Sequence, residues 1–229
     1  MRPAGFEPTT PWFEAKYSNP LSYGRISRVI ITDGGQNVVY FGAMKQVIFA
    51  TSNNEKLLTA QHTCARYDIE ILQKKLDIVE IQSEDPAKVA IDKAQKAFAI
   101  VGQPVVVTDD AWAIPGLGGF PGVYMHSVNE WFTAEDFLRL ILPLQDRRIV
   151  LTQNAVYCDA TGHKIFTQQT EGKLLTEIRG SSKYPSFTIT TMPGDVGQSV
   201  AEVYANISDK SGRESAAVWH DFAVWCQTL

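Results

Sequence analysis

The 229-residue sequence has only three cysteines, Cys64, Cys158 and Cys226, and they lie far apart. An odd number of widely spaced cysteines fits neither a disulfide framework nor a CxxC zinc site. We therefore expect buried free thiols and a reducing compartment. The four histidines show no HxxxH or HxxEH spacing either, so a zinc or serine-hydrolase site has no support.

Long apolar runs and an excess of positive charge are also absent. No segment reaches the roughly 18 apolar residues that a membrane-spanning helix needs. Four prolines interrupt the first 20 residues, where a signal peptide would need an apolar core. The formal net charge is −4, which would not attract a nucleic-acid backbone or an anionic membrane. These absences predict a cytoplasmic protein with no membrane and no polymeric nucleic acid among its partners.

The chain divides by composition at about residue 44. Hydrophobic residues make up 45% of the sequence and charged residues 20%, which suits a globular core. Residues 1–43, however, are rich in Pro, Gly, Ser and Asn and show no sustained hydrophobic period. Within them, residues 5–25 resemble a translated transfer-RNA gene. We expect this extension to lie outside the core and residues 44–229 to form one domain. The hypothesis that Met44 is the natural start fails if the intact mass of native protein includes residues 1–43.

From residue 44 onward, strand and helix patterns alternate. Short β-branched runs at 46–50 and 104–108 predict buried strands, and 68–79 is a further strand region. Apolar residues at helical spacing predict helices over 55–67, 85–101 and 133–142, and a last helix from near Ser211. Segments 148–157 and 164–170 predict a hairpin around Thr161-Gly162. Residues 181–200 give no clear pattern. The fold class is therefore α/β with a mixed sheet.

The first candidate for chemistry is the segment Thr51-Ser52-Asn53-Asn54-Glu55-Lys56, between a predicted strand and a predicted helix. A helix N-terminus presents free N–H groups and a partial positive charge, which suit phosphate oxygens. Ser, Thr and Asn at this place are more often simple helix caps. Without glycines the segment is not a Walker A loop.

The second candidate is a set of acids, Glu80, Glu84, Asp109 and Asp110. Mg²⁺ needs few carboxylates when waters and substrate phosphates complete its shell, and one more acid could activate a water molecule. Acids are usually exposed surface charges, and only the predicted position of Asp109 and Asp110 at the end of a buried strand favours a site. The glycine-rich loop at 116–124 follows; its four glycines allow close approach to a ligand but fit a surface turn equally well.

Taken in order, the segments FATSNNEK (49–56), EIQSE (80–84), IDKAQKA (91–97), VVVTDDAW (105–112) and GLGGFPGVY (116–124) resemble the inosine triphosphate pyrophosphatase family. The resemblance implies an elongated mixed sheet flanked by helices, with two lobes and a nucleotide-binding cleft. It also implies a homodimer that uses Mg²⁺ to cleave a non-standard purine nucleoside triphosphate to its monophosphate and pyrophosphate.

The resemblance assigns a role to particular residues. It places Asp109 on the catalytic acid and Glu80, with Asp109, on the metal site. The residues that it places on substrate-binding positions are Thr51, Ser52, Asn53, Lys56, Lys93, Tyr184 and Arg213.

The C-terminal half departs from the family pattern on the base-recognition side. Residues 183–187, Lys-Tyr-Pro-Ser-Phe, lack the family's Asp, and Ser211-Gly212-Arg213 lacks its His. His126 stands where a lysine is usual. Two alternatives therefore stay open: a related pyrophosphatase with a different base preference, and a catalytically weak nucleotide-binding protein. A substrate panel distinguishes them.

Overall fold

The computed structural model describes residues 26–33, 36–43, 45–206 and 216–229. The chain separates into two compact units, Met1–Ala43 and Met44–Leu229. In the first unit, β1 (Ile26–Asp33) and β2 (Gln36–Ala43) form an antiparallel hairpin. Nothing in our sequence analysis predicts this hairpin, because its apolar residues do not keep a strict alternation.

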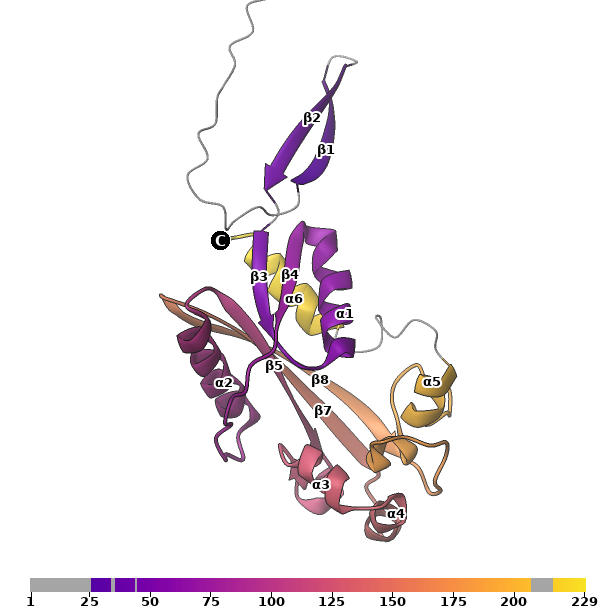
Figure 1. Ribbon diagram of the computed structural model, residues 1–229. Coiled ribbons are helices and arrows are strands. Elements are labelled where there is room, and N and C mark those ends of the chain that lie inside the picture. Colours follow the sequence, from indigo (N-terminus) through magenta and orange to yellow (C-terminus); the bar gives the residue numbers. More distant parts are fainter. Residues whose placement is uncertain (1–25, 34–35, 44, 207–215) are drawn as a thin grey trace, which may run out of the picture. The chain divides into compact units, whose positions relative to one another are not determined.

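The second unit is built on a mixed sheet with the strand order β4-β3-β5-β7-β8-β9 (Figure 1). Strands β4, β3 and β5 run parallel, while β5, β7, β8 and β9 pair antiparallel, and the short β6 adds to β5. This confirms the predicted mixed sheet and the hairpin. The strands are β3 (Lys45–Ala50), β4 (Ile69–Lys74), β5 (Val105–Ala113), β6 (Pro121–Gly122), β7 (Arg148–Asp159), β8 (Gly162–Leu174) and β9 (Thr190–Thr191).

Helices cover both faces of this sheet. The three internal helices predicted from the sequence are found as α1, α2 and α4, while α3 and α5 are additional. The predicted start of the last helix, Ser211, lies outside the described residues. No helix in the described part of the chain has the length and apolar character to cross a membrane. The helices are α1 (Asn54–Cys64), α2 (Pro86–Val101), α3 (Met125–Trp131), α4 (Ala134–Ile141), α5 (Val200–Asn206) and α6 (Ala216–Cys226).

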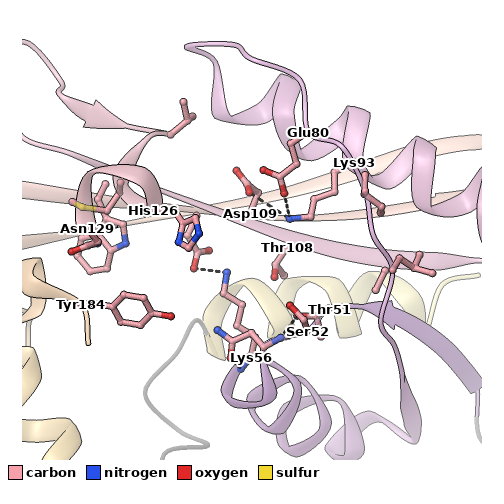
Figure 2. A pocket seen from close by; sticks show the side chains of 18 of the residues that line it. Thr51, Ser52, Lys56, Glu80, Lys93, Thr108, Asp109, His126, Asn129 and Tyr184 are labelled. Atoms are coloured by element: carbon pink, nitrogen blue, oxygen red, sulfur yellow. Dashed lines mark hydrogen bonds and ion pairs between the residues drawn. The ribbon is translucent and has the colours of Figure 1, made fainter. Parts of the chain in front are cut away.

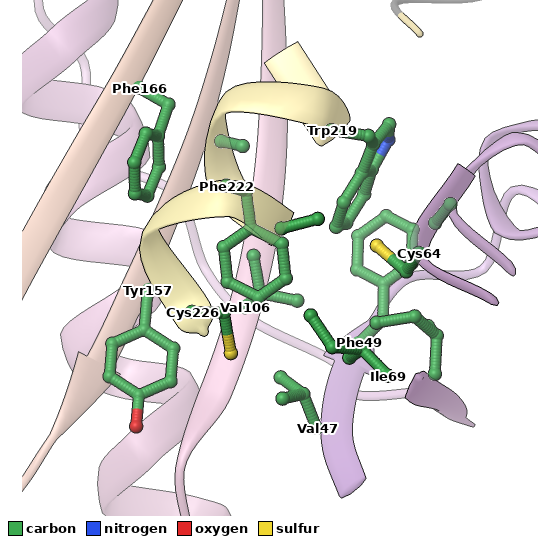
Figure 3. Packing of buried hydrophobic residues seen from close by; sticks show 14 of the residues in the cluster. Val47, Phe49, Cys64, Ile69, Val106, Tyr157, Phe166, Trp219, Phe222 and Cys226 are labelled. Atoms are coloured by element: carbon green, nitrogen blue, oxygen red, sulfur yellow. The ribbon is translucent and has the colours of Figure 1, made fainter. Parts of the chain in front are cut away.

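Neighbouring residues of β5 pack into different cores because side chains alternate along a strand. Val106 belongs to the cluster between the sheet and helices α1 and α6, which also contains Phe49, Trp219 and Phe222 (Figure 3). Val105 and Val107 face the other way and pack with small side chains of α2. All three cysteines are buried and free, as predicted. A third cluster packs α3 and α4 against the other end of the long strands.

Strand β5 is longer than the sequence predicts, and this places its acids differently. Asp109 and Asp110 do not end the strand but lie inside it, because β5 continues to Ala113 along β7. On its other edge, β5 pairs with β3 only at Val105 and Val106 and with β6 only at residues 112 and 113. Among the described strands, none pairs with this edge between those points. The acids therefore lie at an opening in the sheet, which we call the open edge of β5 (residues 107–111).

Candidate functional site

A cleft of about 460 Å³ lies at the open edge of β5 (Figure 2). Its volume is within the range of small-molecule sites, roughly 300–1,000 Å³. The structure thus brings together segments that are far apart in the chain. The predicted site residues that line the cleft are Thr51, Ser52, Asn53, Lys56, Glu80, Lys93, Asp109 and Tyr184. Arg213 lies outside the described residues.

The two acids of the open edge point to opposite faces of the sheet, and each meets a lysine from a different helix. Asp110 is on the face of Val106 and pairs with Lys56 of α1, whose Nζ lies 2.7 Å from Asp110 Oδ2. Asp109 is on the face of Val107, where Lys93 of α2 lies 3.8 Å from its Oδ1. The opening therefore contains carboxylates and ammonium groups in alternation.

Lys93 joins Asp109 to a third acid. Its Nζ lies 2.6 Å from Glu80 Oε1, and Glu80 comes from the irregular segment that precedes α2. Burial raises the pKa of Asp109 to about 6, while the nearby Lys93 ammonium opposes this shift and the Glu80 carboxylate adds to it. A carboxyl group with a pKa near neutrality is well suited to accept a proton.

The segment before α1 acts as a helix cap, as the simpler reading of the sequence proposes, and it also lines the cleft. Asn53 is the N-cap residue, and its Oδ1 accepts hydrogen bonds from the backbone N–H groups of Glu55 and Lys56. Thr51 Oγ1 accepts from the Asn53 N–H at 3.1 Å, so the Thr51 hydroxyl keeps its own hydrogen for another acceptor. The positive end of α1 and the Lys56 side chain face the same space.

The opposite end of the cleft is aromatic. Phe187 lies between Tyr184 and Trp112, with ring centroids 5.1 Å and 6.2 Å apart, and all three line the cleft. Helix α3 adds His126 and Asn129 to this end (Figure 2). Flat apolar rings beside a few polar groups are suited to a planar ring system.

Comparison with known proteins identifies the family of this chain. A sequence model of the Ham1 family matches residues 47–217. The chain belongs to the Ham1 family. It is similar to the dITP/XTP pyrophosphatase of Methanopyrus kandleri, with 33% identity over 140 residues, 61% of this chain and 74% of that protein. It is also 26% identical to inosine triphosphate pyrophosphatase 2 of Trypanosoma cruzi over 170 residues, 74% of this chain and 86% of that protein.

Solved structures of Ham1 proteins share the fold. The Coxiella burnetii HAM1 protein superposes with a TM-score of 0.64 at 19% identity, over 81% of this chain and all of that protein. The Staphylococcus aureus Ham1 protein has the same TM-score at 17% identity, over 80% of this chain and 99% of that one. The resemblance noted in the sequence is therefore confirmed as a family relationship.

The acids of this Ham1-family cleft fit the requirements of Mg²⁺. Mg²⁺ prefers oxygen ligands and is usually held by one or two carboxylates, with waters and substrate phosphates completing its shell. Glu80 and Asp109 supply two carboxylates that already converge on one cation, the Lys93 ammonium. Within the described ranges, no three His, Cys, Asp or Glu side chains come together as a closed metal site. The donor set thus suits an ion that arrives with phosphate ligands.

Several cleft residues of this Ham1 protein are not among the predicted site residues. Asp110 belongs to the predicted set of acids, but only the structure shows its pairing with Lys56. Asn129 lies on α3, a helix of seven residues with no side-chain cap, so the sequence carries little signal for it. Trp112 and Phe187 could have been predicted from the sequence, since they lie within segments 105–112 and 183–187.

Proposed function

We propose that this Ham1-family protein is a nucleoside triphosphate pyrophosphohydrolase. The observation that carries the proposal is the arrangement at the open edge of β5. There Lys56 and Lys93 reach two adjacent carboxylates from opposite faces of the sheet, beside a helix N-terminus. Such a cluster of lysines, free N–H groups and acids suits a polyphosphate better than a neutral ligand.

In the proposed reaction, Asp109 accepts a proton from water as the water oxygen bonds to the α-phosphorus. The bond from that phosphorus to the bridging oxygen breaks, and pyrophosphate leaves while the nucleoside monophosphate remains. Lys56, Lys93 and the Thr51–Asn53 segment hold the phosphate chain and stabilise the charge that develops on the leaving group. Bound Mg²⁺, held by Glu80 and Asp109, would supply further neutralisation of phosphate charge.

The aromatic end of the cleft would hold the base, so that the nucleotide spans two lobes. One lobe contains α1, α2 and α6, and the other contains α3 and α4. Relatives named as dITP/XTP and inosine triphosphate pyrophosphatases favour a non-standard purine such as that of ITP, XTP or dITP. Arg213 belongs to the proposed substrate contacts. Cleavage of such nucleotides would cleanse the nucleotide pool.

The test is pyrophosphate release by residues 44–229, which form one compact unit, with Mg²⁺ and a panel of ordinary, deaminated and modified nucleoside triphosphates. Release from deaminated purines supports the proposal, and release from another set would assign another base preference. No release from any nucleotide would favour the alternative of a nucleotide-binding protein. The same preparation tests the proposed homodimer by light scattering.

A further inference from the structure

Asn129 lies at the aromatic end of the cleft. Its helix, α3, also places Met125 and His126 on the cleft, four and three residues earlier, so these side chains share one face. Figure 2 shows Asn129 near Tyr184 and His126, away from the phosphate-binding segment at Thr51 and Ser52. Asn129 is thus placed to meet a base rather than a phosphate.

The orientation of the Asn129 amide is determined by one hydrogen bond. Asn129 Oδ1 accepts from the backbone N–H of Ser186 at 3.0 Å. A backbone N–H can only donate, so a flipped amide would set two donors against each other. Ser186 is only 3% exposed, and its N–H would lose its partner in a buried place. The carbonyl side of Asn129 is therefore committed to the protein.

The other side of the amide is its NH₂ group. Among the described residues, no atom accepts a hydrogen bond from Asn129 Nδ2, and the side chain lines the cleft. Asn129 thus has NH₂ donors to offer to the cleft, while its Oδ1 already accepts from Ser186. A donor pairs with a carbonyl oxygen on a purine and opposes an amino group at the same position, because the amino hydrogens would face N–H hydrogens.

We propose that Asn129 is a specificity-determining residue that donates from Nδ2 to the exocyclic oxygen of an oxo-purine and disfavours an amino-purine. This inference rests on the proposed function for the placement of the base. It assigns the selection of the base to a residue of α3 rather than to the segment at 183–187.

The central variant is Asn129→Asp. Its carboxylate keeps an acceptor for the Ser186 N–H but presents an acceptor to the cleft in place of the NH₂ donors. Asn129→Ala removes both groups and serves as a second variant. Gln198→Glu is the matched control, because it makes the same change from amide to carboxylate at an exposed residue outside the cleft.

The measurement is calorimetric binding of dIMP and dAMP, which carry the base contrast but no anhydride bond to hydrolyse. We expect wild-type protein and Gln198→Glu to prefer dIMP, Asn129→Ala to lose most of that preference, and Asn129→Asp to shift the ratio toward dAMP by roughly tenfold or more. Equal binding of both nucleotides by wild type, or an unchanged ratio in both Asn129 variants, would overturn the inference.

A parallel assay of pyrophosphate release from dITP and dATP separates the two proposals. Binding that follows Asn129 without any turnover would contradict the hydrolase proposal and support the role of Asn129. Turnover with a base preference that is unchanged in the Asn129 variants would support the hydrolase proposal and contradict the role of Asn129. Circular dichroism melting of Asn129→Asp checks that the segment at 184–188 is still held.

Discussion

Lys93 Nζ lies 2.6 Å from Glu80 Oε1, so the ammonium group of α2 holds the acid that precedes its own helix. The same nitrogen is 3.8 Å from Asp109 Oδ1. In this arrangement a lysine lies between the two carboxylates that, under the proposed function, would hold a divalent ion. Binding of Mg²⁺ with a triphosphate would then release the lysine to the phosphate oxygens, which couples the two binding events.

Glu80→Gln tests the metal role of that acid. The substitution keeps the shape of the side chain but removes a charged oxygen ligand, so we expect the Mg²⁺ concentration for half-maximal activity to rise roughly tenfold. Mg²⁺ titrations of pyrophosphate release measure this. Glu84→Gln, at an exposed residue of the same segment that does not line the cleft, is the control. Equal Mg²⁺ requirements in the two variants would contradict the assignment.

Lys56→Ala should chiefly weaken binding of the triphosphate. Lys56 faces the cleft beside the N-terminus of α1, and a charged contact to phosphate contributes about 10- to 100-fold in affinity. Titration with a nucleoside triphosphate in EDTA gives the dissociation constant without turnover. Lys164→Ala removes a charge from an exposed position on β8 and should leave the affinity as it is. An unchanged affinity in Lys56→Ala counts against its role.

Asp109→Asn should remove most turnover and leave nucleotide binding largely intact. The amide keeps the size of the side chain but cannot take the proton of water, which corresponds to a loss of about 10²- to 10⁴-fold in kcat. Single-turnover rates and dissociation constants must be measured together. Weakened binding with a wild-type rate would show that Asp109 holds the substrate rather than activating water.

The raised pKa of Asp109 also predicts a change of stability with pH in metal-free protein. The unfolded carboxyl titrates near pH 3.8 and the folded one near pH 6, so the folded state binds more protons between these values. The stabilisation of the folded state by Asp109 is therefore fully present below about pH 4 and is lost as the pH rises through 6. For a shift of about two pKa units, this loss in the free energy of unfolding is at most about 3 kcal/mol.

Urea unfolding in EDTA at pH 4 and pH 8 measures this loss. Asp109→Asn cannot ionise, so we expect it to stabilise the protein relative to wild type at pH 8 and much less at pH 4. Asp110→Asn controls for the removal of one negative charge from the same edge. If Asp109→Asn is no more stable than wild type at pH 8, burial of the ionised Asp109 carboxylate does not destabilise the folded protein, and the prediction is wrong.

Phe222→Ala tests the core under α6. Phe222 is fully buried and meets Trp219 edge-to-face at 5.6 Å and Phe166 at 5.8 Å. Truncation of such a ring should reduce the free energy of unfolding by about 3–5 kcal/mol. Val224→Ala, on the same helix but 46% exposed, should stay within about 0.5 kcal/mol of wild type. Chemical denaturation compares the two, and similar losses would argue against the packing described for Phe222.

Elements with strong end signals were predictable from the sequence. Helix α2 is found within one residue of its prediction because Asp85 caps its start, Pro86 occupies its first turn, and Gly102 ends it in the left-handed region. The strand before Thr51 is likewise short, β-branched and followed at once by a capped helix. Local sequence signals were therefore enough to predict the secondary structure of the segments that carry most of the predicted phosphate contacts.

Features that depend on distant pairing were not predictable. The length of β5 follows from its long register with β7, so polar Asp109 and Asp110 continue the strand where the sequence indicates its end. Whether Lys56 would meet Asp109 or Asp110 depends on the face of the sheet, which no spacing along the chain reveals. Asn129 gains its orientation from Ser186, 57 residues away.

The open edge of β5 also bears on how the protein meets other chains. An unpaired stretch of strand is a template on which an extended segment of another chain can add, a route to aggregation. Asp109 and Asp110 place two carboxylates on this stretch, one on each face, and inward-facing charges of this kind discourage strand addition. The two carboxylates that line the cleft therefore also oppose the addition of another strand at the open edge of β5.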